Sequence, residues 1–351
     1  MTPTMVTANA TGRRGAGFGN EAIAWGKAHV AAEALGLRHL APRWAFNRYR
    51  LDRQLGRGRT AMLGADLAAR LLPSTVMTEH LYRNAAVLDF GDAVVAARDA
   101  GMLRGPVLET EGMWGGYAAI ARARGFLHDR VLEAPGARDL AAGGPPSNGL
   151  TIGLHVRRGD FAGGSPGPGS FNQPVESSWF VKVLASLASQ LGDDASYVVC
   201  SDASDDALAE LVAAPRTRLV RGRGPAAPLQ ELAVLASCDL LVCSVSSFSM
   251  LAAFLSDRPY AWFAPQLTVV DDCATIWGHE PAQRRDGSPT REAVSLRSEA
   301  PARGVPVAAD GVVPVDVRAL VGSAAPWDRR RDLLYYGAVP MAADASGGTP
   351  G

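Results

Sequence analysis

The stretch Ile152-Gly153-Leu154-His155-Val156-Arg157-Arg158-Gly159-Asp160 runs from a strand-like apolar segment into a polar segment with two adjacent arginines. From here to about residue 263, apolar runs of strand length alternate with longer runs of helical spacing. This alternation predicts an α/β fold with a parallel sheet wrapped by helices. The predicted strands are 151–156, 197–200, 218–220, 239–243 and 260–263, and the predicted helices are 177–191, 205–212, 228–236 and 247–255.

The first half of the chain carries a weaker pattern of the same kind. Residues 20–34 have helical spacing, with Asn20 at the start. Residues 86–90 and 106–109 are predicted strands, and residues 37–40 are a further candidate strand. The first half of the chain is therefore predicted to form another α/β unit, which precedes the one at 151–263.

The run from Ala142 to Gly149 is rich in Gly, Pro and Ala, which is the composition of a linker. A chain of 351 residues is long enough for two domains. We therefore predict one domain over residues 15–140 and another over 150–335. The remaining ends, 1–14 and 343–351, are predicted to be disordered tails.

Composition excludes several classes of protein. The formal net charge is zero, so a nucleic acid bound through bulk positive charge is not expected as a partner. No apolar run reaches the roughly 18 residues of a membrane span, and the N-terminus lacks a signal core, so we expect no integral membrane segment. The four cysteines show no CxxC spacing, which favours a reducing compartment and a cytoplasmic location.

The polar residues after the strand at 151–156 are the first candidate site. In parallel sheets, ligands bind beyond the carboxyl ends of the strands. Alternation places His155 and Arg157 on one face and Arg158 on the other. Two guanidinium groups there suit a diphosphate, with Asp160 holding one in place. The alternative is a structural ion pair between an arginine and Asp160. Because the glycine-rich segment 163–169 follows, we favour the site.

Two further candidates follow predicted strands of the same half. Ser246, Ser247 and Phe248 lie where a strand passes into a helix, and a helix N-terminus can bind an anion. The alternative is simple capping of that helix by Ser246 or Ser247. Asp202 follows the strand at 197–200, where its carboxylate can bind a nucleoside or share a helix cap with Ser204.

The segment from Gly15 to Glu21 contains glycines spaced like a dinucleotide fingerprint. That fingerprint should follow a strand. No convincing strand precedes it, so we reject a nicotinamide site. What remains is a loop that allows close backbone approach at Gly17 and Gly19, followed by Asn20 and Glu21 at a helix start. The alternative is a flexible turn with Asn20 as the helix cap.

No motif for a metal-dependent transferase is present, because no Asp-x-Asp follows a strand. We therefore expect no metal. Trp114 and Tyr117 offer rings that can stack on a sugar acceptor, but core packing is the simpler explanation.

In order along the chain, these motifs resemble those of the α1,2- and α1,6-fucosyltransferases and the related protein O-fucosyltransferases, here of bacterial type. His155 to Asp160 resembles their first motif, Tyr197 to Asp202 the second, and Val245 to Ser249 the third. Gly17 to Asn20 resembles their N-terminal Gly-Asn-Gln loop. The resemblance spans residues 15–256.

The resemblance implies two facing Rossmann-like domains, the GT-B architecture, in which the second domain holds GDP-fucose. It implies an inverting, metal-independent glycosyltransferase whose partners are a GDP-sugar and a glycan or small-molecule hydroxyl acceptor. Arg157 would contact the β-phosphate and stabilise the leaving GDP, with Arg158 in support. His155 and Asp202 would meet the nucleoside.

The remaining motifs take roles by the same resemblance. Ser246, Ser247 and Phe248 would bind phosphate. Gly17 and Gly19 would let the backbone approach the donor, and Asn20 matches an asparagine near the reacting centre.

This sequence also departs from the family pattern. Glu21 replaces the usual glutamine, so Glu21, Asp160 and Glu176 all remain candidates for the general base. Two alternatives stay open: a transferase of the same fold that uses another GDP-sugar on a secondary metabolite, and a non-catalytic GDP-sugar-binding protein.

Overall fold

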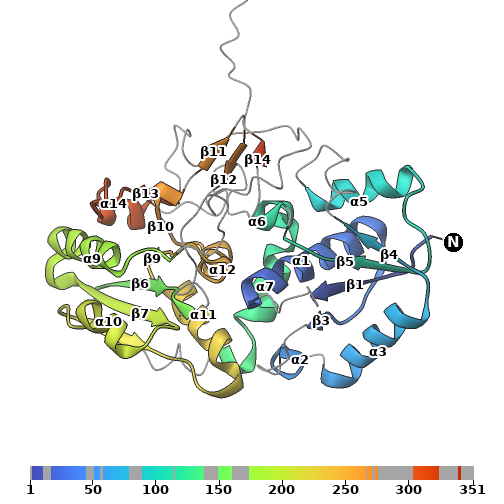
Figure 1. Cartoon of the computed structure of the whole chain (residues 1–351), viewed down its shortest axis with the longest axis horizontal. Helices are drawn as coiled ribbons and strands as arrows, with labels where there is room; N and C mark the ends of the chain where they lie inside the picture. The colour runs from blue at the N-terminus through green and yellow to red at the C-terminus, as the bar shows by residue number, and fades with distance from the viewer. Residues whose placement is uncertain are drawn as a thin grey trace, which may run out of the picture.

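The computed structural model of the 351-residue chain contains two mostly parallel sheets with helices packed around them (Figure 1). This confirms the predicted α/β class with two Rossmann-like units. The structure describes residues 2–10, 17–44, 51–55, 58–78, 89–113, 115–137, 149–159, 174–266, 268–270, 273–275, 303–323 and 339–340. The predicted linker at 142–149 lies outside these ranges except for Gly149, so the domain boundary stays a prediction.

The second half is built on a six-stranded parallel sheet with the strand order β13-β10-β9-β6-β7-β8. The strands are β6 (Leu150–Val156), β7 (Ala195–Ser201), β8 (Thr217–Val220), β9 (Leu240–Val242), β10 (Tyr260–Phe263) and β13 (Gly304–Val307). Both faces of β7 are largely buried, as its continuous apolar run predicts for a parallel strand.

The chain order of these strands is that of a doubly wound nucleotide-binding sheet. Along the chain, β6 comes first, and β7 and β8 are added outward on one side of it. The chain then returns to form β9 on the other side of β6. The point where the direction reverses therefore lies between β6 and β9. A crevice forms beyond the carboxyl ends of such a pair, and that is where ligands bind in this class of sheet.

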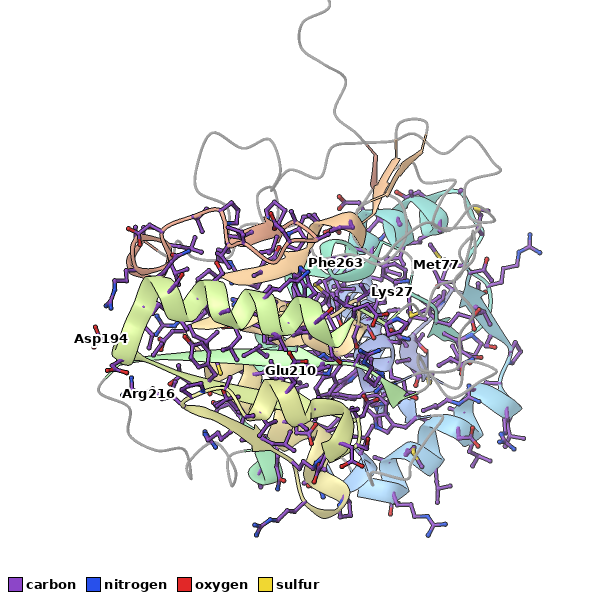
Figure 2. The ribbon with its side chains drawn as sticks, turned by 60° about the vertical axis from the view of Figure 1, so that its left-hand side comes forward. Lys27, Met77, Asp194, Glu210, Arg216 and Phe263 are labelled. Atoms are coloured by element: carbon purple, nitrogen blue, oxygen red, sulfur yellow. The ribbon has the colours of Figure 1, made fainter. Side chains whose placement is uncertain are left out.

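The helices of this half are α9 (Ser177–Leu191), α10 (Asp205–Val212), α11 (Ala227–Ser237), α12 (Ser247–Leu255) and α14 (Val317–Gly322). The bounds of α9, α10 and α12 are those predicted from the sequence. Figure 2 shows Asp194 and Arg216, near the amino ends of β7 and β8, on the far side of this half from Lys27 in the first half.

The first half has a sheet with the order β2-β1-β5-β4, and β3 also pairs with β1. Its strands are β1 (Met5–Ala10), β2 (Arg38–His39), β3 (Arg43–Trp44), β4 (Ser74–Met77) and β5 (Val107–Thr110). Its helices are α1 (Phe18–Leu35), α2 (Leu51–Gln54), α3 (Gly58–Leu71), α5 (Phe90–Asp99), α6 (Gly116–Ala119) and α7 (Arg124–Val131).

The prediction that residues 1–14 form a disordered tail is wrong for residues 5–10. These residues form β1, which pairs with β2, β3 and β5 inside the first sheet. Val6 and Ala8 are completely buried. Since β1 precedes the glycine-rich segment, the reason given for rejecting a dinucleotide fingerprint there is also wrong.

A second difference concerns the predicted strand at 86–90. Residues 86–88 lie outside the described part of the chain, and Phe90 is the first residue of α5. The Asp89 carboxylate accepts hydrogen bonds from the backbone N–H groups of Gly91 and Asp92 and so caps this helix.

The two halves meet through helices near the carboxyl ends of their sheets. In Figure 1, β1 and β6 point toward the boundary between the halves, where α1 lies against α12. Among the described residues, no helix combines the length and apolar character needed to cross a membrane. The fold thus brings the starts of two helices, one from each half, to one boundary.

Candidate active site at the sheet switch point

The candidate site lies where β6 and β9 are neighbours. Register pairing places Ile152 beside Leu240 and Leu154 beside Val242. Both strands end at the same edge, so the residues after β6 come close to the turn that leads from β9 into α12. Each predicted site residue of the second half can be located relative to this edge, except Asp160, which lies outside the described residues.

His155 joins the two sides of the switch point. Its Nδ1 lies 2.9 Å from the Ser244 hydroxyl, and its ring lies 5.3 Å from the ring of Phe248. The side chain is buried, with the residue only 5% exposed. Burial, with a smaller effect of the Arg157 charge, lowers the pKa of His155 to about 3, so the imidazole is neutral at physiological pH. Ser244 is not among the predicted site residues.

The buried, neutral His155 predicts a specific loss of stability in acid. The pKa of His155 is about 3 when folded and 6.5 without the protein environment, so below pH 6.5 the unfolded state binds the extra proton. We expect His155 to remove about 2 kcal/mol of stability between pH 7 and pH 5, with further loss toward pH 3. Denaturant unfolding of the wild type and His155→Asn at each pH measures this, because asparagine does not titrate. Parallel pH curves for the two proteins would contradict it.

Arg157 is held by a carboxylate from the neighbouring strand. Its Nη1 lies 2.6 Å from Oδ2 of Asp202, and the two side chains are 30% and 32% exposed. Oδ1 of Asp202 accepts a hydrogen bond of 2.7 Å from the backbone N–H of Arg158. A side chain at Gly159 would collide with the Asp202 carboxylate. Asp202 therefore fixes the shape of the turn that presents Arg157.

This geometry changes the prediction for Asp202. The alternative role, a helix cap shared with Ser204, is not observed. Ser204 alone caps α10, accepting from the backbone N–H of Ala207. Asp202 instead pairs with Arg157. The predicted role of Asp160 as an arginine partner lies outside the described residues and stays a prediction.

Arg158 extends in a different direction from Arg157. Its Nη2 donates to the Ser177 hydroxyl at 2.6 Å and lies 3.8 Å from the carboxylate of Glu176, both at the start of α9. The Glu176 side chain is largely exposed. The two arginines therefore have different partners, as their predicted positions on opposite strand faces indicated.

The start of α12 is capped as the simpler prediction proposed. The Ser246 hydroxyl accepts a hydrogen bond from the backbone N–H of Phe248 at 3.3 Å. The Ser249 hydroxyl, directed back into the turn, lies 3.1 Å from the carbonyls of Ser244 and Ser246. The cap orders this helix start, and the positive end of the helix dipole faces the boundary between the halves.

The start of α1 lies directly against the start of α12. A Cβ atom at Gly19 would lie 2.5 Å from the backbone carbon and oxygen of Ser247. Gly17, by contrast, is the exposed N-cap residue of α1, and a Cβ there would meet nothing within 4 Å. Of the two predicted glycines, Gly19 is required by close packing in this structure.

Asn20 and Glu21 lie in the first turn of α1 at this contact. Asn20 is partly buried, and its Oδ1 atom is buried with no hydrogen-bond partner among the described residues. Glu21 is 3% exposed. Tyr117 is completely buried, so core packing explains it and stacking on an acceptor does not. Within the described part of the chain, no group of three or more acidic, His or Cys side chains is arranged to hold a metal ion.

Comparisons with known proteins agree with the motif-based resemblance. The model of the family described as glycosyl transferase family 11 matches residues 116–272, which include all three motifs of the second half. This confirms the predicted resemblance to the fucosyltransferases. No curated protein matches the chain.

Several solved structures share the general arrangement at low identity. The fucosyltransferase NodZ from Bradyrhizobium is 16% identical over 77% of this chain and 99% of that chain, with a TM-score of 0.44. POFUT1 in complex with GDP is 14% identical over 75% of this chain and 99% of that chain, with a TM-score of 0.43. At these TM-scores the likeness carries no argument about function.

Proposed function

We propose that this chain, whose residues 116–272 match glycosyl transferase family 11, moves fucose from GDP-fucose to a hydroxyl of a glycan or another acceptor, with inversion at the sugar carbon and without a metal. One observation carries the proposal. Arg157 follows β6 and the capped start of α12 follows β9, so both lie at the switch point of the sheet, where sheets of this class bind nucleotides.

The chemistry requires positive charge near the leaving group. As the bond from sugar to diphosphate breaks, negative charge grows on the diphosphate while the sugar becomes oxocarbenium-like. The guanidinium of Arg157, positioned by Asp202, and the positive end of α12 can stabilise that charge. Neutral His155 adds no charge of its own and fixes the turn before α12 through Ser244.

The first half is proposed to hold the acceptor. Inversion requires the acceptor hydroxyl to approach the sugar from the face opposite to the leaving diphosphate. The first turn of α1 reaches the boundary from the other half and carries Asn20 and Glu21. Glu21 is our candidate for the base that accepts the hydroxyl proton, and Asn20, whose Oδ1 can accept a hydrogen bond, orients the acceptor. Gly17 at the N-cap lines the donor approach.

The remaining assignments follow from the same proposal. Residues up to about 140, now including β1, form the acceptor side, and residues 150–335 form the donor side. Cys200, Cys238 and Cys243 are free and buried, which supports a reducing, cytoplasmic location.

A binding panel tests the proposal and its metal independence. Thermal unfolding is measured with GDP-fucose, GDP-mannose, GDP and UDP-glucose, each with and without EDTA. GDP-fucose at a hundredfold excess over its Kd is expected to add about 2.7 kcal/mol of stability, unchanged by EDTA, while UDP-glucose adds none. A shift that EDTA abolishes contradicts metal independence.

The same panel separates the alternative functions. If another GDP-sugar stabilised the protein more strongly than GDP-fucose does, that GDP-sugar would be identified as the donor. Tight GDP-fucose binding with neither hydrolysis nor transfer, across a range of acceptors, would identify a non-catalytic binding protein.

A further inference from the structure

The segment that begins at α6 and ends with α7 holds helix α12 at both of its ends. At the start of α12, the Tyr117 hydroxyl lies 2.8 Å from the carbonyl oxygen of Ser247. At the other end, Arg124 donates to the carbonyls of Phe254 and Leu255 at 2.6 and 3.2 Å and pairs with Asp257 at 2.7 Å. Figure 1 shows α6 and α7 beside α1 at the boundary with the second half. The first half therefore contacts both ends of α12, and the start of α12 forms part of the proposed donor site.

The Tyr117 hydroxyl also contacts the first turn of α1. It lies 2.9 Å from the carbonyl oxygen of Gly19. Residues 19, 117 and 247 are far apart in sequence, so one hydroxyl joins three separate segments. A tyrosine hydroxyl has a single proton. The proton is shared between the carbonyl oxygens of Gly19 and Ser247. Without it, these two hydrogen-bond acceptors would have no donor between them.

The surroundings of Tyr117 keep this hydroxyl a donor. The residue is completely buried, and its ring stacks on Phe254 with centroids 5.0 Å apart. Burial raises the pKa of Tyr117 well above its ordinary value, so the phenol stays protonated across the physiological range. A phenol that stays protonated cannot accept the hydroxyl proton, which excludes Tyr117 as the general base.

We propose that Tyr117 is a positioning residue that sets the spacing between the start of α1 and the start of α12, and thereby between the acceptor side and the donor side of the site. The inference rests on the proposed function, in which Asn20 and Glu21 act from α1 while the α12 start and Arg157 hold the diphosphate. Gly19 serves the same contact, since only a glycine lets the two helix starts approach so closely.

The variant Tyr117→Phe tests this, with Arg124→Gln as the matched control. Phenylalanine keeps the ring against Phe254 and removes only the shared proton. We expect kcat for transfer to fall by about tenfold to a hundredfold, because a small misplacement of reacting groups is costly. The Kd for GDP should change by less than about threefold, because Arg157 and the Ser246 cap are held by contacts within the second half. Arg124→Gln acts on the far end of α12 and should lower the melting temperature while leaving kcat within about twofold.

A second readout does not depend on activity. Hydrogen exchange of the backbone amides in residues 18–25 should accelerate by about fivefold or more in Tyr117→Phe and remain unchanged in Arg124→Gln. If the wild type transfers no fucose, the proposed function fails, and this exchange measurement still decides the role of Tyr117. The inference is overturned if exchange in residues 18–25 is unchanged in Tyr117→Phe. It is equally overturned if kcat is unchanged in that variant, or if kcat falls by the same factor in the control.

Discussion

Arg157→Ala is expected to lower kcat for fucose transfer by about 10²–10³-fold, which is the usual cost of removing one preorganised group that meets developing charge. Arg157 follows β6 at the switch point, and Asp202 holds its guanidinium in place. In the proposed reaction no metal neutralises the departing diphosphate, so this guanidinium carries a large share of that task. Steady-state kinetics with GDP-fucose measures the effect.

The fold should survive this substitution. Arg157 and Asp202 are each about a third exposed, and ion pairs with that much exposure add little to stability. We therefore expect the melting temperature to stay within a few degrees of the wild type. A large loss of stability would mean that the fall in activity reports unfolding and not chemistry.

Arg158→Ala is the matched control, because it removes the same charge from the next position. Its guanidinium is directed to Ser177 and Glu176 at the start of α9. We expect its effect on kcat to be about tenfold or less. Normal turnover in Arg157→Ala, or equal losses in the two variants, would contradict the assignment of the leaving-group role to Arg157.

The second half could be predicted closely because its signals are local. The strands β6, β7, β9 and β10 are largely apolar runs, and α9 and α10 bury apolar residues at helical spacing. The starts of α10 and α12 are marked by Ser204 and Ser246, whose hydroxyls cap the helices as serine at such positions predicts. Local sequence therefore sufficed for these bounds.

Strand β1 could not be predicted in this way. The segment from Met5 to Ala10 mixes apolar residues with alanine and asparagine, and these have modest strand propensity. Its strand conformation depends on pairing with Arg38–His39 and Val107–Thr110, which lie far along the chain. A sequence pattern over about ten residues does not show which distant strands a segment will pair with.

The same limit explains why Asp202 was not predicted as a partner of Arg157. Asp160 was predicted to hold one of the two arginines because it is close to both in sequence, and that prediction falls outside the described residues. In the structure, β6 and β7 run parallel with Val156 beside Ser201, so the residues after both strands meet at one edge and Asp202 reaches Arg157. Aligning the ends of the predicted parallel strands would have found Asp202, and the same step at β9 would have found Ser244.

Gly19→Ala is expected to damage both stability and activity. The added Cβ would lie 2.5 Å from the carbonyl group of Ser247 and 2.7 Å from the backbone nitrogen of Phe248. Backbone atoms cannot rotate away as a flexible side chain can, so one helix start must move. We expect a loss of about 1–3 kcal/mol in the free energy of unfolding, typical of overpacking a well-packed contact. Chemical denaturation measures it.

The loss of transfer should exceed what the loss of stability explains. Moving the first turn of α1 displaces Asn20 and Glu21 from the donor side, and a shift of about 1 Å can lower the rate by about 10²-fold. Gly125→Ala is the matched control: it is a helical glycine in α7 with nothing within 4 Å of the added Cβ. Because alanine favours a helix over glycine by about 1 kcal/mol, this variant should be as stable as the wild type or more so, with unchanged turnover. If Gly19→Ala also kept normal turnover in the folded protein, the meeting of the two helix starts would not be part of the active site. The acceptor-side roles proposed for Asn20 and Glu21 would then fail with it.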